Sequence, residues 1–307
     1  MTRRADLRGV MGSEQELTAV LTAVFGEAGL DGSLHALDID SAAEVRHRSD
    51  EVWHSASTGE VPILVTLMRA VAAGEVSLRE RVRIPADGRT PGFTGLSVMR
   101  YEAELALRDV AQLMIAVSDN HATDLVLGRV SPQQVTAAMR ELGLTVTTLE
   151  ETLGQTYQRL ASSDPGTDLD LTPAAAPWHS TAAEMCRLLR KIWLDEAAPA
   201  RLCEEMRTIL RSSVLPEGLD SAFPLPVQVQ TGGKSGAAFF IDTDGESGIS
   251  LVVRNEVGVI EYPDGGRYAV AVFTRTGSRE AKLRDLTASR AIGMAALAAV
   301  EHLRAHS

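Results

Sequence analysis

Hydrophobic residues near the N-terminus recur first with helical and then with strand spacing. Residues 14–29 carry the i, i+3, i+4 stripe of an amphipathic helix, which we expect to end near Gly29. Residues 35–40 then alternate between apolar and polar, and residues 43–48 follow a short turn as their candidate partner. The pattern predicts one helix followed by a β-hairpin.

Helical spacing dominates the middle of the chain. The segments that show it are 61–73, 105–117, 122–127, 132–142, 181–194 and 199–210. Residues 150–178 interrupt this spacing with Thr, Asp, Ser, Pro and Ala, a composition that favours a long loop or lid. The middle of the chain is therefore predicted to be a block of helices with one long connection.

Beyond Val227 the spacing changes to that of strands. The predicted elements are strands at 227–241, 249–260 and 267–276, separated by turn residues, and a last helix at 278–304. We predict an α/β (α+β) fold, in which an antiparallel sheet from both chain ends is packed by both terminal helices. The sheet domain would comprise residues 1–56 and 212–307, and an inserted all-helical domain would comprise residues 57–211, with the lid at 150–178.

Composition narrows the classes of protein that this chain can belong to. With 307 residues, of which 45% are hydrophobic and 23% charged, it is long and apolar enough to bury a large core. A net charge of -11 and the lack of any Lys/Arg run disfavour a nucleic-acid or anionic-membrane partner. A small-molecule substrate fits better, and the oligomeric state is left open.

The N-terminal residues and the two cysteines lead us to expect a cytoplasmic protein without cofactors. The basic first ten residues are followed by Ser13-Glu14-Gln15-Glu16 and not by an apolar signal core, so we expect no export signal. Cys186 and Cys203 lie in helical patterns with no CxxC or His spacing. We therefore expect no disulfide framework, metal or other cofactor.

One serine at a predicted helix start allows two interpretations. Ser57-Thr58-Gly59-Glu60 opens the first helix of the block, and the positive end of a helix dipole suits a nucleophile. Ser-x-x-Glu is also a capping box, in which Ser57 caps the helix and Glu60 returns to the serine N–H. From this element alone, the capping box is the stronger interpretation.

Two further polar motifs lie in apolar surroundings. Ser118-Asp119-Asn120 presents a hydroxyl and an amide from one short connection, and alone it favours an N-cap cluster. Lys234-Ser235-Gly236 lies in a predicted central strand, where a lysine is costly to bury without a partner.

In this order, the three motifs resemble the active site of the serine β-lactamase and penicillin-binding protein superfamily, most closely class A. The stretches that look like the corresponding parts of the family are 55–64, 74–82, 114–124, 254–259 and 268–272. The resemblance thus extends over about the whole chain and implies the fold predicted from the hydrophobic pattern.

The resemblance implies catalytic roles for three residues. Ser57 would be the acylated nucleophile, and Ser118 would shuttle a proton between the attacking hydroxyl and the leaving nitrogen. Lys234 would supply positive potential.

The resemblance also implies a substrate-binding side formed by Asn120, Ser235, Gly236 and Ala237. Asn120 would hold a substrate side-chain amide, and Ser235 would bind a substrate carboxylate. The N–H groups of Ser57 and Ala237 would form the oxyanion hole beside Gly236.

Two departures from the family pattern put the chemistry in question. The family's Ser-x-x-Lys is Ser-x-x-Glu here, so Glu60 stands where the activating lysine belongs, with a reference pKa about six units lower. Class A enzymes also carry a Glu-x-x-Leu-Asn loop whose glutamate activates the deacylating water, and residues 150–178 contain no such pentad. Glu150, Glu151, Asp164, Asp168 and Asp170 are the candidate substitutes, and their spacing selects none.

Three hypotheses follow for the function. The first is a cytoplasmic serine hydrolase or acyltransferase of actinobacterial specialised metabolism, with weak or no β-lactamase turnover. It would act on an amide, ester or lactam of a small molecule. The second is a binding protein or pseudoenzyme in which Glu60 and Lys234 form a buried ion pair. The third is a cyclase or isomerase that uses Glu60 as acid or base and Lys234 to stabilise negative charge.

Overall fold

Both ends of the chain contribute to one five-stranded antiparallel sheet. The computed structural model describes residues 13–162, 176–214, 217–223, 229–241, 249–276 and 285–306. Its strand order is β2-β1-β10-β9-β8. The strands are β1 (Asp31–Asp38), β2 (Glu44–His47), β8 (Gln230–Ile241), β9 (Ile249–Glu261) and β10 (Arg267–Thr276). The predicted hairpin is confirmed, because β2 pairs with β1 in antiparallel register.

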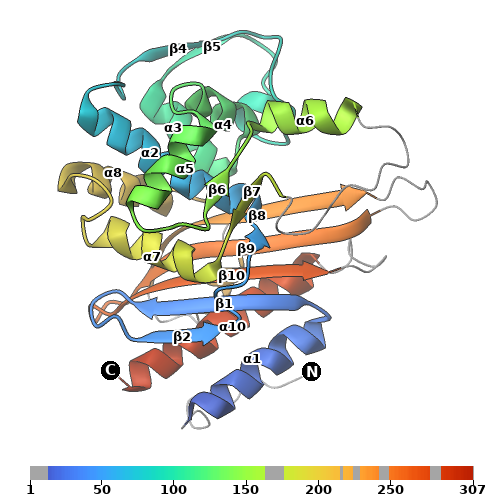
Figure 1. Cartoon of the computed structure of the whole chain (residues 1–307), viewed down its shortest axis with the longest axis vertical. Helices are drawn as coiled ribbons and strands as arrows, with labels where there is room; N and C mark the ends of the chain where they lie inside the picture. Colours follow the sequence, from blue (N-terminus) through green and yellow to red (C-terminus); the bar gives the residue numbers. More distant parts are fainter. Residues whose placement is uncertain are drawn as a thin grey trace.

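The terminal helices cover one face of this sheet. Helix α1 (Glu14–Ala28) has the predicted bounds within one residue, because a capping box begins it at Ser13 and the left-handed Gly29 ends it. It lies beside α10 (Asp285–His306) under the sheet, with the short α9 (Glu217–Ala222) packed against α10 (Figure 1). A hydrophobic cluster from α1, α10 and the inner strands fills this side.

The predicted helical block covers the other face. Its helices are α2 (Glu60–Ala73), α3 (Leu107–Val117), α4 (Asn120–Leu127), α5 (Pro132–Glu141), α7 (Ala182–Trp193) and α8 (Ala200–Arg211). A single hydrophobic cluster joins these helices to the sheet residues Val257, Ala271 and Phe273. The mixed helix and antiparallel-sheet fold is confirmed, and the helical block and the sheet share one core.

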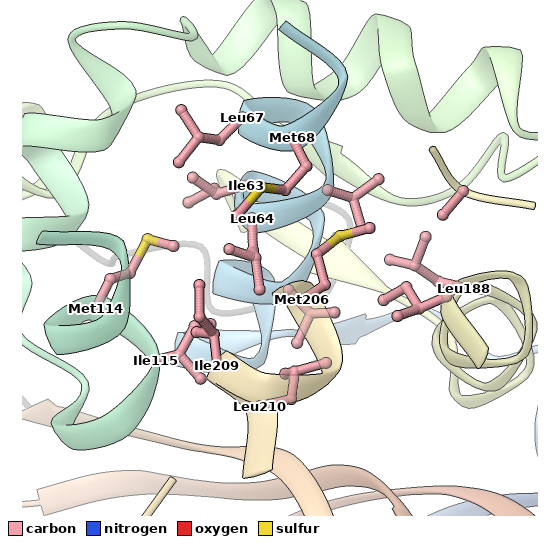
Figure 2. Packing of buried hydrophobic residues seen from close by; sticks show 14 of the residues in the cluster. Ile63, Leu64, Leu67, Met68, Met114, Ile115, Leu188, Met206, Ile209 and Leu210 are labelled. Atoms are coloured by element: carbon pink, nitrogen blue, oxygen red, sulfur yellow. The ribbon is translucent and has the colours of Figure 1, made fainter. Parts of the chain in front are cut away.

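Helix α2 runs through the middle of that core. Figure 2 shows Ile63, Leu64, Leu67 and Met68 of α2 facing side chains from α3, α7 and α8. The stretch Ala56–Ala73 passes for a membrane span by length and composition, with a mean hydropathy of 1.2, yet 72% of it is buried inside the protein. Burial on all sides explains why α2 lacks a polar face and why its N-terminus lies deep in the molecule.

The prediction of an all-helical inserted domain was wrong, because short strands also lie within residues 57–211. Strands β6 (Thr148–Leu149) and β7 (Trp178–Ser180) form one small sheet with β3 (Trp53–His54), and β4 (Arg81–Ile84) forms another with β5 (Ala103–Ala106). Strand β3 pairs with β7, so the segment before Ser57 is joined to the end of the predicted lid.

The prediction of a continuous loop over residues 150–178 was wrong for its first part, which forms helix α6 (Leu153–Ser162). Asp124 accepts hydrogen bonds from the N–H groups of Leu153 (2.9 Å) and Gly154 (2.7 Å), and so caps this helix from another element. The sequence did offer one signal, the capping box Thr152-x-x-Gln155, whose two hydrogen bonds (2.8 and 3.2 Å) are present, whereas a cap from 29 residues away cannot be predicted locally. Asp164, Asp168 and Asp170 lie outside the described residues, as do the N-terminal residues 1–12 on which the export expectation rests.

Candidate active site

Ser57 lies on a short 3₁₀ helix, η2 (Ala56–Gly59), which leads directly into α2. The N-cap of α2 is Gly59, which makes no side-chain capping bond. The capping-box interpretation of Ser57 and Glu60 was therefore wrong, because α2 begins two residues too late for Ser57 to be its cap. Ser57 is half-buried, at the junction of β3, η2 and the sheet.

The carboxylate of Glu60 is the centre of a buried polar cluster. Its Oε1 accepts a hydrogen bond from Ser118 Oγ at 3.1 Å, and its Oε2 lies 3.5 Å from Lys234 Nζ. The Ser57 hydroxyl lies close enough to this carboxylate to lower its pKa. Glu60 and Lys234 are both fully buried. The structure thus brings Ser57, Glu60, Ser118 and Lys234 together, and the predicted ion pair is present.

Burial changes the acidity of both partners in this pair. Burial raises the pKa of Glu60 to about 7, although Lys234, Ser118 and Ser57 act in the opposite direction. Burial also lowers the pKa of Lys234, against the attraction of Glu60. The cost of desolvation exceeds the gain from pairing. Glu60 is consequently able to take or give a proton near neutral pH.

Lys234 lies on β8, which is the edge strand of the sheet and not the central strand that the hydrophobic pattern predicted. Its side chain is nevertheless buried because the helical block covers this part of the strand. Nζ donates a hydrogen bond to the carbonyl of Ser235 at 2.5 Å. The ammonium therefore has two oxygen partners, one charged and one neutral.

Ser118 ends α3 in the left-handed conformation, with φ of 52°, and Asp119 caps α4. Asp119 accepts hydrogen bonds from the N–H groups of His121 and Ala122. The N-cap interpretation of this motif was correct for Asp119. The sharp turn leaves the Ser118 hydroxyl free to point toward Glu60.

Gly236 is the point where β8 passes closest to the nucleophile. A Cβ at Gly236 would lie 2.9 Å from Ser57 N and 2.8 Å from Thr58 N, so only glycine allows this approach. The N–H of Ala237 follows one residue later. The backbones of η2 and β8 thus approach each other where an oxyanion hole requires N–H donors.

Comparison with known proteins agrees with this geometry. The profile of the Beta-lactamase enzyme family matches residues 14–303. The chain belongs to the β-lactamase enzyme family. The resemblance to the serine β-lactamase and penicillin-binding protein superfamily is thereby confirmed.

Individual relatives of this β-lactamase-like chain are distant. A β-lactamase regulatory protein, BlaB, of Streptomyces cacaoi is 26% identical over 296 residues, which cover 86% of this chain and 90% of that protein. A β-lactamase of Sphaerobacter thermophilus has a TM-score of 0.74 at 24% identity, over 92% of this chain and 94% of the other. A class A β-lactamase of Bacteroides cellulosilyticus reaches a TM-score of 0.77 at 16% identity, over 95% and 98%. These two structures are similar to the chain in fold.

Two side chains that the β-lactamase resemblance assigns to the substrate lie differently from that expectation. Asn120 donates its amide N–H groups to the carbonyl of Pro91 (2.7 Å) and to Tyr157 Oη (3.1 Å) on α6. Ser235 is buried and pairs across the sheet with Glu256, whose carboxylate contacts α9 on the opposite face from Glu60. The register therefore does not favour Ser235 as a carboxylate ligand, and its role stays a prediction.

Two of the candidate bases, Glu150 and Glu151, lie in the part of the lid that the structure describes; Glu150 is exposed. Glu151 accepts hydrogen bonds from Thr156 (2.8 Å) and Arg159 (2.8 Å), and these partners hold the pKa of its carboxyl below its usual value against the effect of burial. Because its pKa is lowered, Glu151 is a weaker base than an ordinary glutamate.

Sequence reasoning did not single out Asn255, which contacts the segment before Ser57 from β9. The polar run Arg254-Asn255-Glu256 interrupts an otherwise apolar strand, and this was the signal available. Asn255 donates to the carbonyls of His54 (2.8 Å) and Ser55 (3.1 Å).

Proposed function

We propose that this β-lactamase-like protein forms an acyl-enzyme at Ser57 with the amide, ester or lactam carbonyl of a small molecule. The single observation that carries the proposal is the buried Glu60 carboxylate, which contacts Ser118 and Lys234 and whose pKa the Ser57 hydroxyl lowers. A carboxylate so placed can replace the missing lysine as general base.

Each group in the cluster has one part in the proposed reaction. Ser57 Oγ bonds to the carbonyl carbon while its proton passes to the Glu60 carboxylate. The electron pair displaced onto the carbonyl oxygen is stabilised by the N–H groups of Ser57 and Ala237 and by the charge of Lys234. When the bond to the leaving nitrogen or oxygen breaks, Ser118 relays the proton from Glu60 to that atom, and the acyl group remains as an ester on Ser57.

We propose slow release of the acyl group. Glu151 is held by Arg159, so α6 presents no ionised carboxylate that is free to activate water. Such a protein would retain its ligand covalently and hydrolyse β-lactams weakly or not at all. An intracellular location and a place in specialised metabolism stay predictions drawn from the sequence.

A second candidate is a ligand-binding protein that never acylates. The fully buried ion pair of Glu60 and Lys234 favours it, because each charge serves as the partner of the other and such a pair can be retained without any acyl transfer. The relative from Streptomyces cacaoi is named a regulatory protein, which also fits a binding role.

Intact-protein mass spectrometry with a fluorescent penicillin and, separately, a fluorophosphonate distinguishes the two candidates. An adduct on the native protein that Ser57→Ala abolishes supports acyl transfer. No adduct on the native protein, together with one on Glu60→Lys, which restores Ser-x-x-Lys, supports the non-acylating protein. Turnover of the adduct over hours measures deacylation directly.

A further inference from the structure

Asn255 uses its whole side-chain amide to hold the segment that precedes the nucleophile. It is fully buried on β9, and its nitrogen donates to the carbonyls of His54 at 2.8 Å and Ser55 at 3.1 Å. Its oxygen accepts from the N–H of Thr274 at 3.2 Å, on the neighbouring strand β10. Two acceptors on one side and a donor on the other allow only this orientation of the amide.

The held segment has a backbone conformation that needs external support. Ala56 has φ of 47°, in the left-handed region that disfavours residues with a Cβ. Its N–H donates to His54 Nδ1 at 2.9 Å, and Ser57 follows immediately. A residue in this region persists only where the surroundings impose it. The Asn255 bonds fix the two carbonyls directly before Ala56.

Asn255 also pairs with the residue of β8 that lies close to Ser57. Asn255 is in register with Gly236 of β8, and a Cβ at Gly236 would meet Ser57 N at 2.9 Å and the Ser55 carbonyl at 3.0 Å. One residue pair of the β8–β9 ladder therefore determines both where η2 lies and how closely β8 approaches it.

We infer that Asn255 is a positioning residue for Ser57: it holds residues 54–56 on the sheet and so sets the distance between the Ser57 N–H and β8. The inference rests on the proposed acylation of Ser57. It adds that the sheet, through β9, and not the start of α2, controls the oxyanion donors.

The test compares Asn255→Asp, which keeps the shape but loses both donated hydrogen bonds, with Thr274→Val. Thr274 is equally buried and its hydroxyl donates to Arg254 O, so its loss weakens the sheet without touching residues 54–56. We expect Asn255→Asp to slow acylation by the fluorescent penicillin about 100-fold, with reversible affinity measured in a Ser57→Ala background unchanged within about threefold. Thr274→Val should leave the acylation rate within about twofold of the wild type.

Two further measurements separate positioning from loss of stability. The introduced carboxyl regains a donor when protonated, so the rate of Asn255→Asp relative to wild type should rise as pH falls. Ala56→Gly removes the conformational penalty at φ 47°. Added to Asn255→Asp, it should raise the acylation rate at least tenfold above that of Asn255→Asp alone. Asn255→Ser retains one donor, so its acylation rate should be about tenfold below that of the wild type. This variant replaces Asn255→Asp in the test if Asn255→Asp does not fold.

Hydrogen exchange at residues 54–58 judges the inference without any acylation. Exchange at least tenfold faster in Asn255→Asp than in Thr274→Val supports it, even if the native protein forms no adduct and the proposed function fails. Equal exchange in the two variants, or equal loss of acylation for equal loss of stability, overturns it while leaving acylation at Ser57 intact.

Discussion

At the scale of single residues, Glu60 stands where the superfamily pattern has a lysine, and this changes the charge of the site. Its carboxylate contacts Ser118 and Lys234, and the Ser57 hydroxyl lowers its pKa. The superfamily pattern places two lysines in this cluster, whereas this protein has one lysine, Lys234, and one glutamate, Glu60. Because the pair is buried, protonation of Glu60 decides whether the site is neutral or cationic.

Glu60→Gln should slow acylation of Ser57 by about 10²- to 10⁴-fold, because an amide cannot accept the serine proton. In the wild type the rate should rise with pH through about 7, the pKa of Glu60, since only the ionised form acts as base. Labelling rates between pH 5.5 and 8.5 measure both effects. Glu151→Gln is the matched control and should leave the acylation rate unchanged. A flat wild-type profile would contradict the assignment of Glu60 as base.

Gly236→Ala should reduce acylation at least tenfold, because the added Cβ would lie 2.8 Å from Thr58 N and 2.9 Å from Ser57 N and must displace β8 or η2. Gly26→Ala on α1 is the control, since no atom lies within 4 Å of its Cβ, and it should stabilise the helix by up to about 1 kcal/mol. Rates and urea unfolding of the two variants are the measurements. Unchanged acylation in Gly236→Ala would show that this contact does not set the oxyanion donors.

At the scale of elements, α6 depends on a distant side chain. The Asp124 carboxylate accepts hydrogen bonds from Leu153 N, Gly154 N and Thr90 Oγ1. None of the side chains of α6 is buried, so packing contributes little to its position. One turn beyond the cap, Tyr157 meets Asn120 of the Ser118-Asp119-Asn120 motif. The lid is therefore coupled to the site through α4.

Asp124→Ala should release α6 while leaving the rest of the helical block folded. Loss of the cap costs about 1 kcal/mol locally, so hydrogen exchange at residues 153–162 should accelerate several-fold. Asp109→Ala, a change at an exposed carboxylate on α3, should leave that exchange as in the wild type. Protection of α6 that survives Asp124→Ala would mean that other contacts hold the lid.

At the scale of the whole molecule, buried carboxylates and a buried histidine have opposite effects on how stability depends on pH. Burial raises the pKa of Glu256 to about 7, so the folded state binds more protons than the unfolded state from pH 4.5 to 7, and stability falls as pH rises. Burial lowers the pKa of His54 to about 4, so the folded state binds fewer protons there than the unfolded state, and stability falls as pH drops below 6.5. Between pH 4.5 and 6.5 the two effects partly cancel.

Glu256→Gln should remove the fall in stability with rising pH that the raised pKa of Glu256 causes. The free energy of unfolding of the wild type minus that of Glu256→Gln should decrease by up to about 1.4 kcal/mol per pH unit between pH 4.5 and 7. Urea unfolding at half-unit pH steps gives this difference. A difference that stays constant with pH would show that Glu256 titrates at its ordinary value.

Much of the fold follows from the sequence because its signals are local and strong. The stripe of residues 14–29, the alternation at 35–40 and the apolar strands near the C-terminus indicate elements that the structure contains within a few residues. The order of Ser57, Ser118-Asp119-Asn120 and Lys234-Ser235-Gly236 was sufficient to indicate the superfamily. These are properties of spacing along the chain, which a linear sequence records.

Tertiary structure decided most partners of the buried polar groups. The superfamily resemblance implied that Glu60 pairs with Lys234, but only the packed structure shows that its carboxylate accepts a hydrogen bond from Ser118, 58 residues away, and does not form the capping box with Ser57. The edge position of β8, the cap that Asp124 supplies to α6 and the hold of Asn255 on residues 54–55 likewise depend on distant partners. Hydrophobic spacing determines elements, whereas the partners of buried polar atoms are determined only once those elements pack.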